Sequence, residues 1–490
     1  MAKKIEKNSQ LELELPEDKV YANPTKKFFV EMLTRDIDLI DAIMDLVDNC
    51  IDGVHRQRKK KKPSKGEKFY TGFRAEILIS ADEFSVKDNC GGIPEDVAKN
   101  YAFKMGRDDA YTNDKDLETV GVYGIGMKRA FFKIGNESTV ISHHDDSIFQ
   151  VTVPSDWPST PEWLFDFKKL LKKDVSTLLP QNGTYLKVTK IHPNIKKRFG
   201  DKVGFLTNLK SKLNEHYGYI IDQGFEIKLN SSVIKPLHIK VISEEPAKNS
   251  KKAIMPYVYN GTIDGVSIEV IVGFYRPPAK ADELEKGLEG SYADSTSENA
   301  GVTVLCNDRI VLYGNKDHLT GWGDKPVPSY HTQFINVMGV VFFRSNTPVK
   351  LPVTTTKRGL DTSSAVYSTA RNKIKEGLKL FTQFTNLWKE PTEERAHLFK
   401  RAHTINALVP GKTKTVFKLQ KAKKGSDGEY QIPDLPKPAV IKKDNAVNIV
   451  FKRDKVRVEE MQEYFFPEED KTPSEIGAWC FDELYSQIEK

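Results

Sequence analysis

The stretch DLVDNCIDG (residues 45–53) lies in the part of the sequence with the clearest helical pattern. Apolar residues recur there at spacings of three and four, which predicts a helix over residues 24–57 with one side facing a core. These apolar positions are Leu33, Ile37, Ile40, Met44, Val47 and Ile51. The opposite side carries Asp41, Asp45, Asp48, Asn49 and Asp52. Like charges four residues apart repel by roughly 0.2–0.5 kcal/mol, so we expect cationic groups beside this acidic side.

The same stretch places a carboxylate and an amide one helical turn apart, at Asp45 and Asn49. An aspartate can orient a water molecule, and an asparagine side-chain oxygen can ligate Mg²⁺. Taken alone, the pair also fits the ordinary polar surface of a helix.

A second motif, DNCGGI (88–93), follows two strand-like runs, RAEILIS (74–80) and EFSVKD (83–88), which predict a β-hairpin. Asp88 ends the second run, and because its carboxylate only accepts hydrogen bonds, it suits an exocyclic amine such as that of adenine. Gly92 allows a flat ring to approach the backbone. An ordinary tight turn is the alternative interpretation.

The third motif, GVYGIGMKRA (121–130), places Gly121, Gly124 and Gly126 just before an apolar helix. Free N–H groups at a helix start attract phosphate, and Lys128 adds a point charge. A flexible loop before a helix is the alternative. The sequence has no GxxxxGK[ST] motif, and GxxGxG is the reverse of GxGxxG, so neither a P-loop nor a dinucleotide-binding fold is indicated.

Together with a later Gly183-Thr184 pair, the three motifs resemble the GHKL superfamily of ATPases. This superfamily contains gyrase B, Hsp90-type chaperones, MutL, histidine kinases and MORC proteins. The resemblance covers residues 1–195 and is closest in character to MutL- and MORC-like prokaryotic proteins. It implies a Bergerat-type α/β sandwich that binds ATP with Mg²⁺.

By this resemblance, Asn49 holds Mg²⁺ and Asp88 binds adenine, while Gly92, Ile93 and Thr184 line the base pocket. The resemblance also implies a lid of residues 94–126. The residues expected at the phosphates are Gly121, Gly124, Gly126 and Lys128.

Two positions depart from the family pattern. Hydrolytic GHKL proteins carry Glu four residues before the Asn, and this chain has Asp45 there. A carboxylate drawn back by about 1 Å can lose ~10²-fold in rate, so slow hydrolysis is expected. Cys90 replaces the first glycine of the second motif, although Gly91 follows it.

A second domain resembles the transducer of gyrase, Hsp90-type chaperones and MutL. LCNDRIV (305–311) is similar to a MutL-type strand, and VTTTKRGLD (353–361) is similar to the loop whose lysine reaches the γ-phosphate. By resemblance that catalytic lysine is Lys357, which would distinguish ATP from ADP because the extra phosphate supplies its partner charge. An exposed loop lysine is the alternative.

The expected fold class is therefore α+β, with a Bergerat-type α/β sandwich, a transducer-like α+β domain and a helical C-terminal region. The expected segments are 1–195 (ATP binding), 196–362 (transducer-like), 363–408 (helical), 409–445 (basic linker or arm) and 446–490 (helical tail). The strand-like run FEIKLN near residue 225 is assigned to the second domain. Residues 474–488 are expected to form a helix capped by Ser474, with one apolar side that docks a partner.

Length and charge limit the number of domains and the kinds of partner that the sequence predicts. A chain of 490 residues predicts two to four domains. Its formal charge of +7 is small, but residues 409–443 hold nine lysines and three acids, a net charge of +6 that suits DNA or a solvated linker. The adjacent His143 and His144 are interpreted as a solvated turn rather than a metal site.

Four separated cysteines, Cys50, Cys90, Cys306 and Cys480, show no metal-site spacing and indicate a reducing compartment. The N-terminus lacks the apolar region of a signal peptide, and no run of about 18 apolar residues occurs. A cytoplasmic protein without a membrane span is expected.

The leading hypothesis is an ATP-dependent conformational switch with slow ATP hydrolysis that closes as a homodimer on ATP binding. A DNA-linked role in restriction or anti-phage defence rests on analogy between folds. The alternatives are a nucleotide-binding scaffold or sensor with little hydrolysis, and a chaperone-like client binder.

Overall fold

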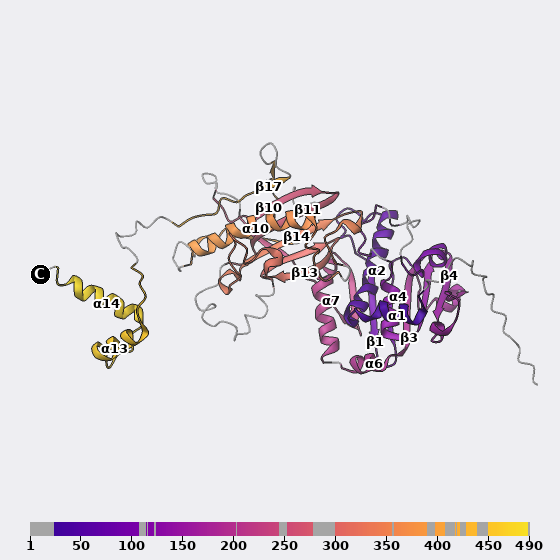
Figure 1. Cartoon of the computed structure of the whole chain (residues 1–490). Helices are drawn as coiled ribbons and strands as arrows, with labels where there is room; N and C mark the ends of the chain where they lie inside the picture. The colour runs from indigo at the N-terminus through magenta and orange to yellow at the C-terminus, as the bar shows by residue number, and fades with distance from the viewer. Residues whose placement is uncertain are drawn as a thin grey trace, which may run out of the picture. The chain divides into compact units, whose positions relative to one another are not determined.

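The computed structural model describes residues 24–488 except for 107–113, 115, 122–123, 202, 245–251, 278–298, 355–356, 390–396, 407–416, 418, 422–427 and 439–448. The chain divides into two compact units, Met1–Pro438 and Ala439–Lys490 (Figure 1). Two mixed β-sheets, each with helices packed on it, form the first unit, and the second unit is helical. The fold class is therefore α+β, as the sequence predicts.

The first sheet has eight strands in the order β5-β4-β3-β6-β2-β1-β7-β8. Its strands are β1 (Arg74–Ile79), β2 (Phe84–Asp88), β3 (Gly135–His144), β4 (Ser147–Val153), β5 (Asp166–Lys169), β6 (Gly183–Ile191), β7 (Glu226–Leu229) and β8 (Ser232–Val233). The predicted hairpin is confirmed, because β1 and β2 pair antiparallel with Ile77 opposite Val86. Buried and accessible residues alternate along β1, as expected for a sheet with one face on the core.

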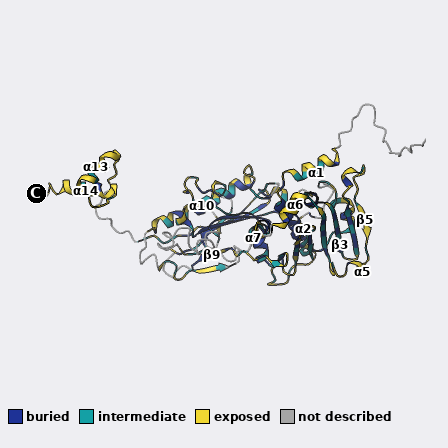
Figure 2. Ribbon diagram, turned by 90° about the horizontal axis from the view of Figure 1, so that it is seen from below, coloured by how far each residue is buried: buried dark blue, intermediate teal, exposed yellow. Residues whose placement is uncertain are grey.

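Helices cover that core-facing side (Figure 2). The longer ones are α1 (Lys26–Arg35), α2 (Leu39–Lys60), α4 (Gly126–Ile134), α6 (Pro193–Gly200) and α7 (Phe205–Asp222). Short turns of helix are α3 (Glu95–Val97), η1 (Ala98–Ala102), η2 (Trp157–Ser159) and α5 (Lys172–Val175). Helix α2 is almost wholly buried between α4, α7 and β1, so its polar residues lie inside the domain.

The helix predicted over residues 24–57 is two helices in the structure. The chain leaves α1 at Asp36, and Asp38 caps α2 by accepting a hydrogen bond from the Ile40 N–H at 2.8 Å. Aspartate favours such caps over helix interiors, because its short side chain bonds nearby backbone N–H groups. The apolar pattern continues across the break, which is why periodicity alone does not reveal it.

The second sheet has seven strands in the order β13-β12-β14-β11-β10-β17-β16. Its strands are β10 (Tyr257–Ile263), β11 (Val266–Phe274), β12 (Gly301–Cys306), β13 (Arg309–Asn315), β14 (Val337–Arg344), β16 (Gln420–Lys421) and β17 (Glu429–Gln431). Short 3₁₀ turns are η3 (His318–Thr320), η4 (Thr332–Phe334) and η5 (Pro348–Lys350). Nearly every residue of the central strands is buried, because both faces of the sheet are covered.

One face of this sheet is covered by the long helix α10 (Ala365–Leu387), which packs on β10, β11 and β14. The other face meets α7 and the two-stranded sheet of β9 (Lys240–Ser243) and β15 (His403–Asn406). Helix α7 therefore packs both on the helical layer of the first sheet and on β13, and it joins the two halves of the unit.

Two segments lie elsewhere than the sequence analysis places them. The run FEIKLN forms β7, which pairs parallel with β1, so the first sheet extends past residue 195. Residues 429–431 of the basic stretch pair with β10 and belong to the second sheet. Most of the lysines in residues 409–443 lie outside the described residues.

The C-terminal unit contains α13 (Lys455–Phe465) and α14 (Pro473–Tyr485). Thr472, rather than the predicted Ser474, caps α14, in a capping box with Glu475. Serine and threonine both suit an N-cap position. Thr472 takes it because Glu475, three residues later, completes the capping box. Ile476 is the one fully buried side chain among the described residues of this unit.

Candidate functional site

The acidic side of α2 faces a set of cations, as the sequence predicts. The ion pairs are Arg358–Asp41, Arg129–Asp45, Lys357–Asp45, Lys357–Asp48 and Arg309–Asp48. These cations come from α4, from the start of β13 and from the loop before α10, so three distant segments converge on one helix.

Asp45 has both carboxylate oxygens in ion pairs. Its Oδ2 atom lies 2.5 Å from the Arg129 guanidinium, and its Oδ1 atom lies 3.3 Å from Lys357 Nζ. The side chain is 7% exposed, so these charges interact with little screening by water. Asp45 is thereby fixed in one orientation.

Asp48, one turn along α2, is fully buried among hydrogen-bond donors. Its Oδ1 atom accepts from Tyr217 Oη at 2.7 Å and lies 3.1 Å from Arg309 Nε, while Oδ2 lies 2.7 Å from Lys357 Nζ. Burial raises the pKa of Asp48, but the Arg309 and Lys357 charges lower it more, and the net shift is downward. Asp48 is therefore the anion that holds Lys357 inside the first domain.

Asn49 is the exposed residue in an otherwise buried part of α2. It lies one helical turn from Asp45. Magnesium typically takes one or two protein ligands and keeps water and substrate phosphates as the others, so a single accessible amide fits it. Among the described residues, no three His, Cys, Asp or Glu side chains are grouped to hold a metal by themselves.

Asp88 lies at the end of β2, beside Cys50 of α2. Its Oδ1 atom accepts from the N–H groups of Cys90 at 2.7 Å and Thr184 at 3.3 Å. The Oδ2 atom receives the Cys50 thiol at 3.7 Å, a weak bond that leaves this oxygen able to accept from an amine. Burial raises the pKa of Asp88 to about 6.

The turn after Asp88 requires glycine for space as well as for conformation. Gly92 has φ +71°, and a Cβ atom there would lie 2.2 Å from the His143 carbonyl oxygen. Gly183, on the neighbouring strand, would place a Cβ atom 2.1 Å from the Asp88 carbonyl oxygen. Ile93 then exchanges two hydrogen bonds with the buried Ser142 hydroxyl. These contacts hold the predicted base-binding residues together.

The glycine-rich motif begins on another carboxylate of α2. Asp52 accepts from the N–H groups of Val120 at 2.6 Å and Gly121 at 2.9 Å, and its burial raises its pKa to about 6. Gly124 has φ +66°, and Gly126 begins α4 with its Cα beside Asp45, where a Cβ atom would lie 3.2 Å from the carboxylate carbon. The helix start predicted to bind phosphate therefore lies against Asp45.

Lys128 is placed differently from the prediction. The sequence analysis expects it at the phosphates, but its Nζ atom donates to the carbonyl oxygens of Ala102, at 2.8 Å, and Gly124. The side chain is 2% exposed, and burial lowers its pKa to about 8. In this structure Lys128 ties η1 to the glycine-rich motif.

Residues 37–164 match the family model described as histidine kinase-, DNA gyrase B-, and HSP90-like ATPase. The match spans α2, Asp88 and the glycine-rich motif, all of which the structure brings together. Residues 37–164 form a GHKL-type ATPase domain. No curated protein sequence is significantly similar to the chain. In the part of the chain that the structure describes, no helix has the length and hydropathy of a membrane span.

Around the GHKL domain, the structure adds residues that the sequence analysis did not assign. Asp48 and Asp52 were noted only as members of the acidic side, and Arg129 and Arg309 were not assigned any role. The available signal was the excess of acids on α2, which demands cations but cannot say which ones. Arg129 directly follows Lys128, and Arg309 lies inside the LCNDRIV stretch.

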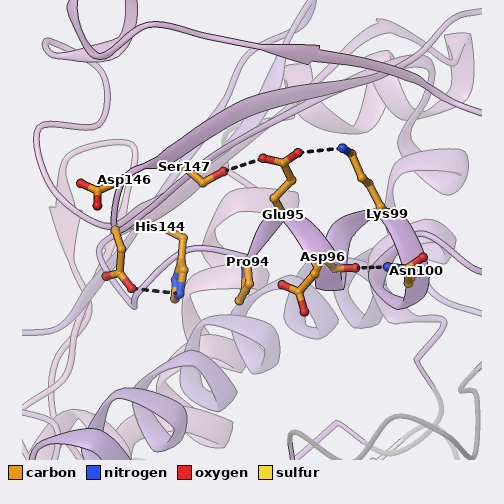
Figure 3. A pocket seen from close by; sticks show the side chains of 9 residues that line it. Pro94, Glu95, Asp96, Lys99, Asn100, His144, Asp146 and Ser147 are labelled. Atoms are coloured by element: carbon orange, nitrogen blue, oxygen red, sulfur yellow. Dashed lines mark hydrogen bonds and ion pairs between the residues drawn. The ribbon is translucent and has the colours of Figure 1, made fainter.

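A surface pocket of about 730 Å³ adjoins the turn that is predicted to bind the base (Figure 3). Its lining residues come from α3, η1 and the β3–β4 turn and include Glu95, Lys99 and His144. None of the predicted ATP-binding residues lines it. Glu95 bonds Lys99 at 2.7 Å and Ser147 at 3.1 Å, so its charge is already compensated.

The interpretation of His143 and His144 as a solvated turn is wrong for His143. His143 is 4% exposed and its Nδ1 atom lies 2.9 Å from the Leu179 carbonyl oxygen. His144 Nδ1 lies 2.6 Å from the Gly91 carbonyl oxygen. The two rings point in opposite directions, as expected for neighbours on a strand, and each fixes a separate segment.

Proposed function

We propose that this protein binds ATP with Mg²⁺ in the GHKL domain, hydrolyses it slowly and uses the difference between ATP and ADP to move its second domain. The observation that carries the proposal is the position of Lys357. This lysine belongs to the loop before α10, yet its ammonium lies within 3.3 Å of two carboxylates on α2. A cation from one domain thus lies on the acidic helix of the other, beside the helix start that we propose for the phosphates.

The proposed roles follow from the geometry. Asp88 accepts from the exocyclic amine of adenine, and the backbone at Gly92, Ile93 and Thr184 surrounds the base. Gly121, Gly124 and the start of α4 at Gly126 face the phosphates. The first N–H groups of a helix have no partner within the helix, which makes a helix start a common phosphate-binding arrangement.

Asn49 would hold Mg²⁺, which neutralises phosphate charge when bound. Asp45, one turn away, is the proposed base that orients the attacking water. The terminal phosphate would compete with Asp45 and Asp48 for Lys357. ADP lacks that phosphate and would leave the lysine with the two carboxylates, which is how the loop would report the nucleotide state.

Slow hydrolysis has two structural supports. Asp45 is one methylene shorter than the Glu of hydrolytic relatives, and its two oxygens are held by Arg129 and Lys357. Both oxygens are therefore occupied, and one partner must leave before that oxygen can orient a water molecule. A nucleotide sensor with little hydrolysis is therefore the second candidate, and the Arg129–Asp45 contact favours it.

The proposal includes a homodimer that forms on ATP binding. Phe28 and Met32 lie on one face of α1 and are more than half exposed, beside the Phe29–Trp163 ring contact. An exposed apolar surface of this kind is typical of an association site. Light scattering with and without ATP tests this, and Phe28→Glu should prevent dimer formation without preventing ATP binding.

Two further contacts remain proposals of the same kind. DNA binding is proposed for residues 409–443, whose lysines would make it weaken as salt increases. A protein partner is proposed for residues 474–488, where Phe481, Leu484 and Tyr485 are at least half exposed on α14. A role in restriction or anti-phage defence would require the DNA contact. Replacement of the lysines of this stretch by glutamine, which leaves the strand residues 429–431 in place, tests it.

Calorimetry tests the central proposal. Wild-type protein should bind ATP and ADP in the presence of Mg²⁺, and Asn49→Ala and Asp88→Asn, each shown to be folded, should weaken binding at least tenfold. Steady-state phosphate release then separates the slow ATPase from the sensor. A folded wild-type protein that binds neither nucleotide would overturn the proposal.

A further inference from the structure

A second contact joins the GHKL domain to the second sheet, at a distance from Lys357 along the chain. It involves the segment Glu118–Gly121, which leads into the glycine-rich motif, and the turn between β12 and β13. Asn307 and Asp308 form that turn. Arg344, at the end of β14, lies next to it.

The turn residues are built for this position. Asn307 has φ +46° and Asp308 has φ +70°, the left-handed conformation that Asn and Asp tolerate better than other side chains. Asn307 is fully buried, and Asp308 is 5% exposed. Buried polar residues in such a conformation persist when specific hydrogen bonds hold them.

The orientation of the Asn307 amide is fixed by its partners. Its Nδ2 atom donates to the carbonyl oxygens of Thr119 at 2.9 Å and Ser345 at 3.1 Å, and its Oδ1 atom accepts from the Ser345 N–H at 3.0 Å. Two carbonyl partners require the nitrogen on that side. The second sheet therefore holds the backbone of Thr119 directly.

Arg344 adds an ion pair to the same segment. Its NH1 atom lies 2.6 Å from Glu118 Oε2, and its NH2 atom contacts Asp308. Asp308 also accepts from Tyr70 Oη at 2.9 Å. One guanidinium thus connects the segment to the turn of the second sheet.

From the opposite side, the same segment is held by α2. The N–H groups of Val120 and Gly121 donate to the Asp52 carboxylate. Of these four consecutive residues, Glu118 and Thr119 are therefore bound by the second sheet, and Val120 and Gly121 by the helix that carries Asp45 and Asn49. Gly121, the first glycine of the motif, is the last of the four.

We propose that Asn307 and Arg344 are positioning residues that hold Glu118 and Thr119, and through them set the place of Gly121 at the phosphate end of the site. The link to nucleotide rests on the proposed function. If ATP contacts this motif, ATP binding and the contacts of the β12–β13 turn are coupled, and each changes the equilibrium of the other by the same factor. This coupling does not pass through Lys357.

The test uses two variants of the full chain and a matched control. Glu118→Ala removes the ion pair and leaves Arg344 bonded to Asp308. Asn307→Gly removes the amide and retains the left-handed backbone. The control is Glu67→Ala, because Glu67 also pairs with an arginine, Arg58, and its side chain is 29% exposed, as is that of Glu118.

Amide hydrogen exchange of the nucleotide-free protein is the first measurement. Both variants should exchange the Val120 and Gly121 amides about three- to tenfold faster than wild type, the effect of losing one hydrogen bond or ion pair. The control should not change exchange there, although all three variants lower thermal stability. Unchanged exchange in both variants would overturn the positioning role.

Calorimetry with ATP and Mg²⁺ is the second measurement. Both variants should bind ATP about three- to tenfold more weakly, and the control should bind within about twofold of wild type. Faster exchange with unchanged affinity would overturn the link to nucleotide. Absence of binding by wild-type protein would instead overturn the proposed function, while the exchange comparison still decides the positioning role.

Discussion

Lys357 Nζ lies 2.7 Å from Asp48 Oδ2, although 309 positions separate the two residues in the chain. Asp48 is completely buried and the Lys357 side chain is 11% exposed. The Lys357 carbonyl oxygen also accepts from Arg309, which itself contacts Asp48. A lysine of the second domain is thereby held on the central helix of the GHKL domain. Any ligand that competes for the ammonium must alter this connection.

Asp45→Glu should raise the rate of ATP hydrolysis. The added methylene extends the side chain by about 1 Å, and a shift of this size can change a rate by up to ~10²-fold. Steady-state phosphate release at saturating ATP measures the change in kcat. Asp45→Asn, which retains the size but removes the charge, is the control and should abolish turnover. An unchanged kcat in Asp45→Glu would show that side-chain length does not limit the reaction.

ATP affinity should fall as the pH decreases below about 6. Burial raises the pKa of Asp88 from 3.8 to about 6, so its folded-state carboxylate gains a proton between pH 7 and pH 5. A protonated Asp88 presents a hydroxyl where the amine of adenine requires an acceptor. Calorimetry between pH 7 and pH 5 should show a loss of affinity of up to about tenfold, the change in the ionised fraction of Asp88 over this range.

The Asp88→Asn variant separates this titration from that of Asp52. Asp52 also has its pKa raised to about 6 by burial, so it gains its proton in the same range. The pH dependence of ATP affinity that remains in Asp88→Asn comes from Asp52 and other groups. If the wild type and the variant show the same pH profile, Asp88 is not the acceptor.

The same two shifts affect stability with a defined sign. A carboxyl whose folded pKa is raised contributes stability that is present below pH 3.8 and is lost as the pH rises through about 6. At neutral pH, Asp52 and Asp88 of the nucleotide-free protein are ionised while buried, and this lowers the free energy of unfolding. Denaturant unfolding should show that these two groups contribute less to the free energy of unfolding at pH 7 than at pH 5. Asp88→Asn should reduce this difference between the two pH values.

Arg309→Met should destabilise the first unit strongly. The arginine is 2% exposed, and its loss would leave Asp48 with Lys357 as its remaining cation among the contacts described. Removing one partner of a buried ion pair costs about 3–5 kcal/mol when nothing else compensates the remaining charge, and Lys357 still pairs with Asp48, so we expect a loss toward the lower end of this range. Urea unfolding measures the loss in free energy of unfolding.

The matched control is Lys196→Met. Lys196 pairs with Asp82 at 2.5 Å, but the two side chains are 53% and 81% exposed. Exposed pairs contribute about 0–1 kcal/mol, so this variant should unfold almost as wild type does. Equal losses of unfolding free energy in Arg309→Met and Lys196→Met would contradict the stabilising role of the buried ion pairs at Asp48.

The sequence predicts the residues of the candidate site better than the contacts between them. Asp45, Asn49, Asp88 and Gly126 occur in local motifs, because a helix face or a strand end brings the required side chains together within a few residues. The acidic side of α2 also predicts its need for cations. The identity of those cations depends on packing between segments that are far apart, which no local pattern encodes.

Similar reasons explain the differences in the fold. Strand β7 pairs parallel with β1, and such a pairing depends on a long connection rather than on a turn signal. Lys128 follows the glycines as a phosphate-binding lysine would, but the nearby carbonyl oxygens of Ala102 and Gly124 take its ammonium instead. His143 resembles a turn residue in sequence, and tertiary contact with Leu179 buries it.

The measurement that tests the central claim most directly is the ratio of ATP to ADP affinity in wild type and in Lys357→Met, by calorimetry with Mg²⁺. Lys357 meets the terminal phosphate in this account, so wild type should bind ATP more tightly than ADP, and the variant should lose about tenfold of that preference with ADP affinity nearly unchanged. Arg58→Met, an arginine paired with Glu67 away from the site, is the control. An unchanged ratio in a folded Lys357→Met protein would contradict the account.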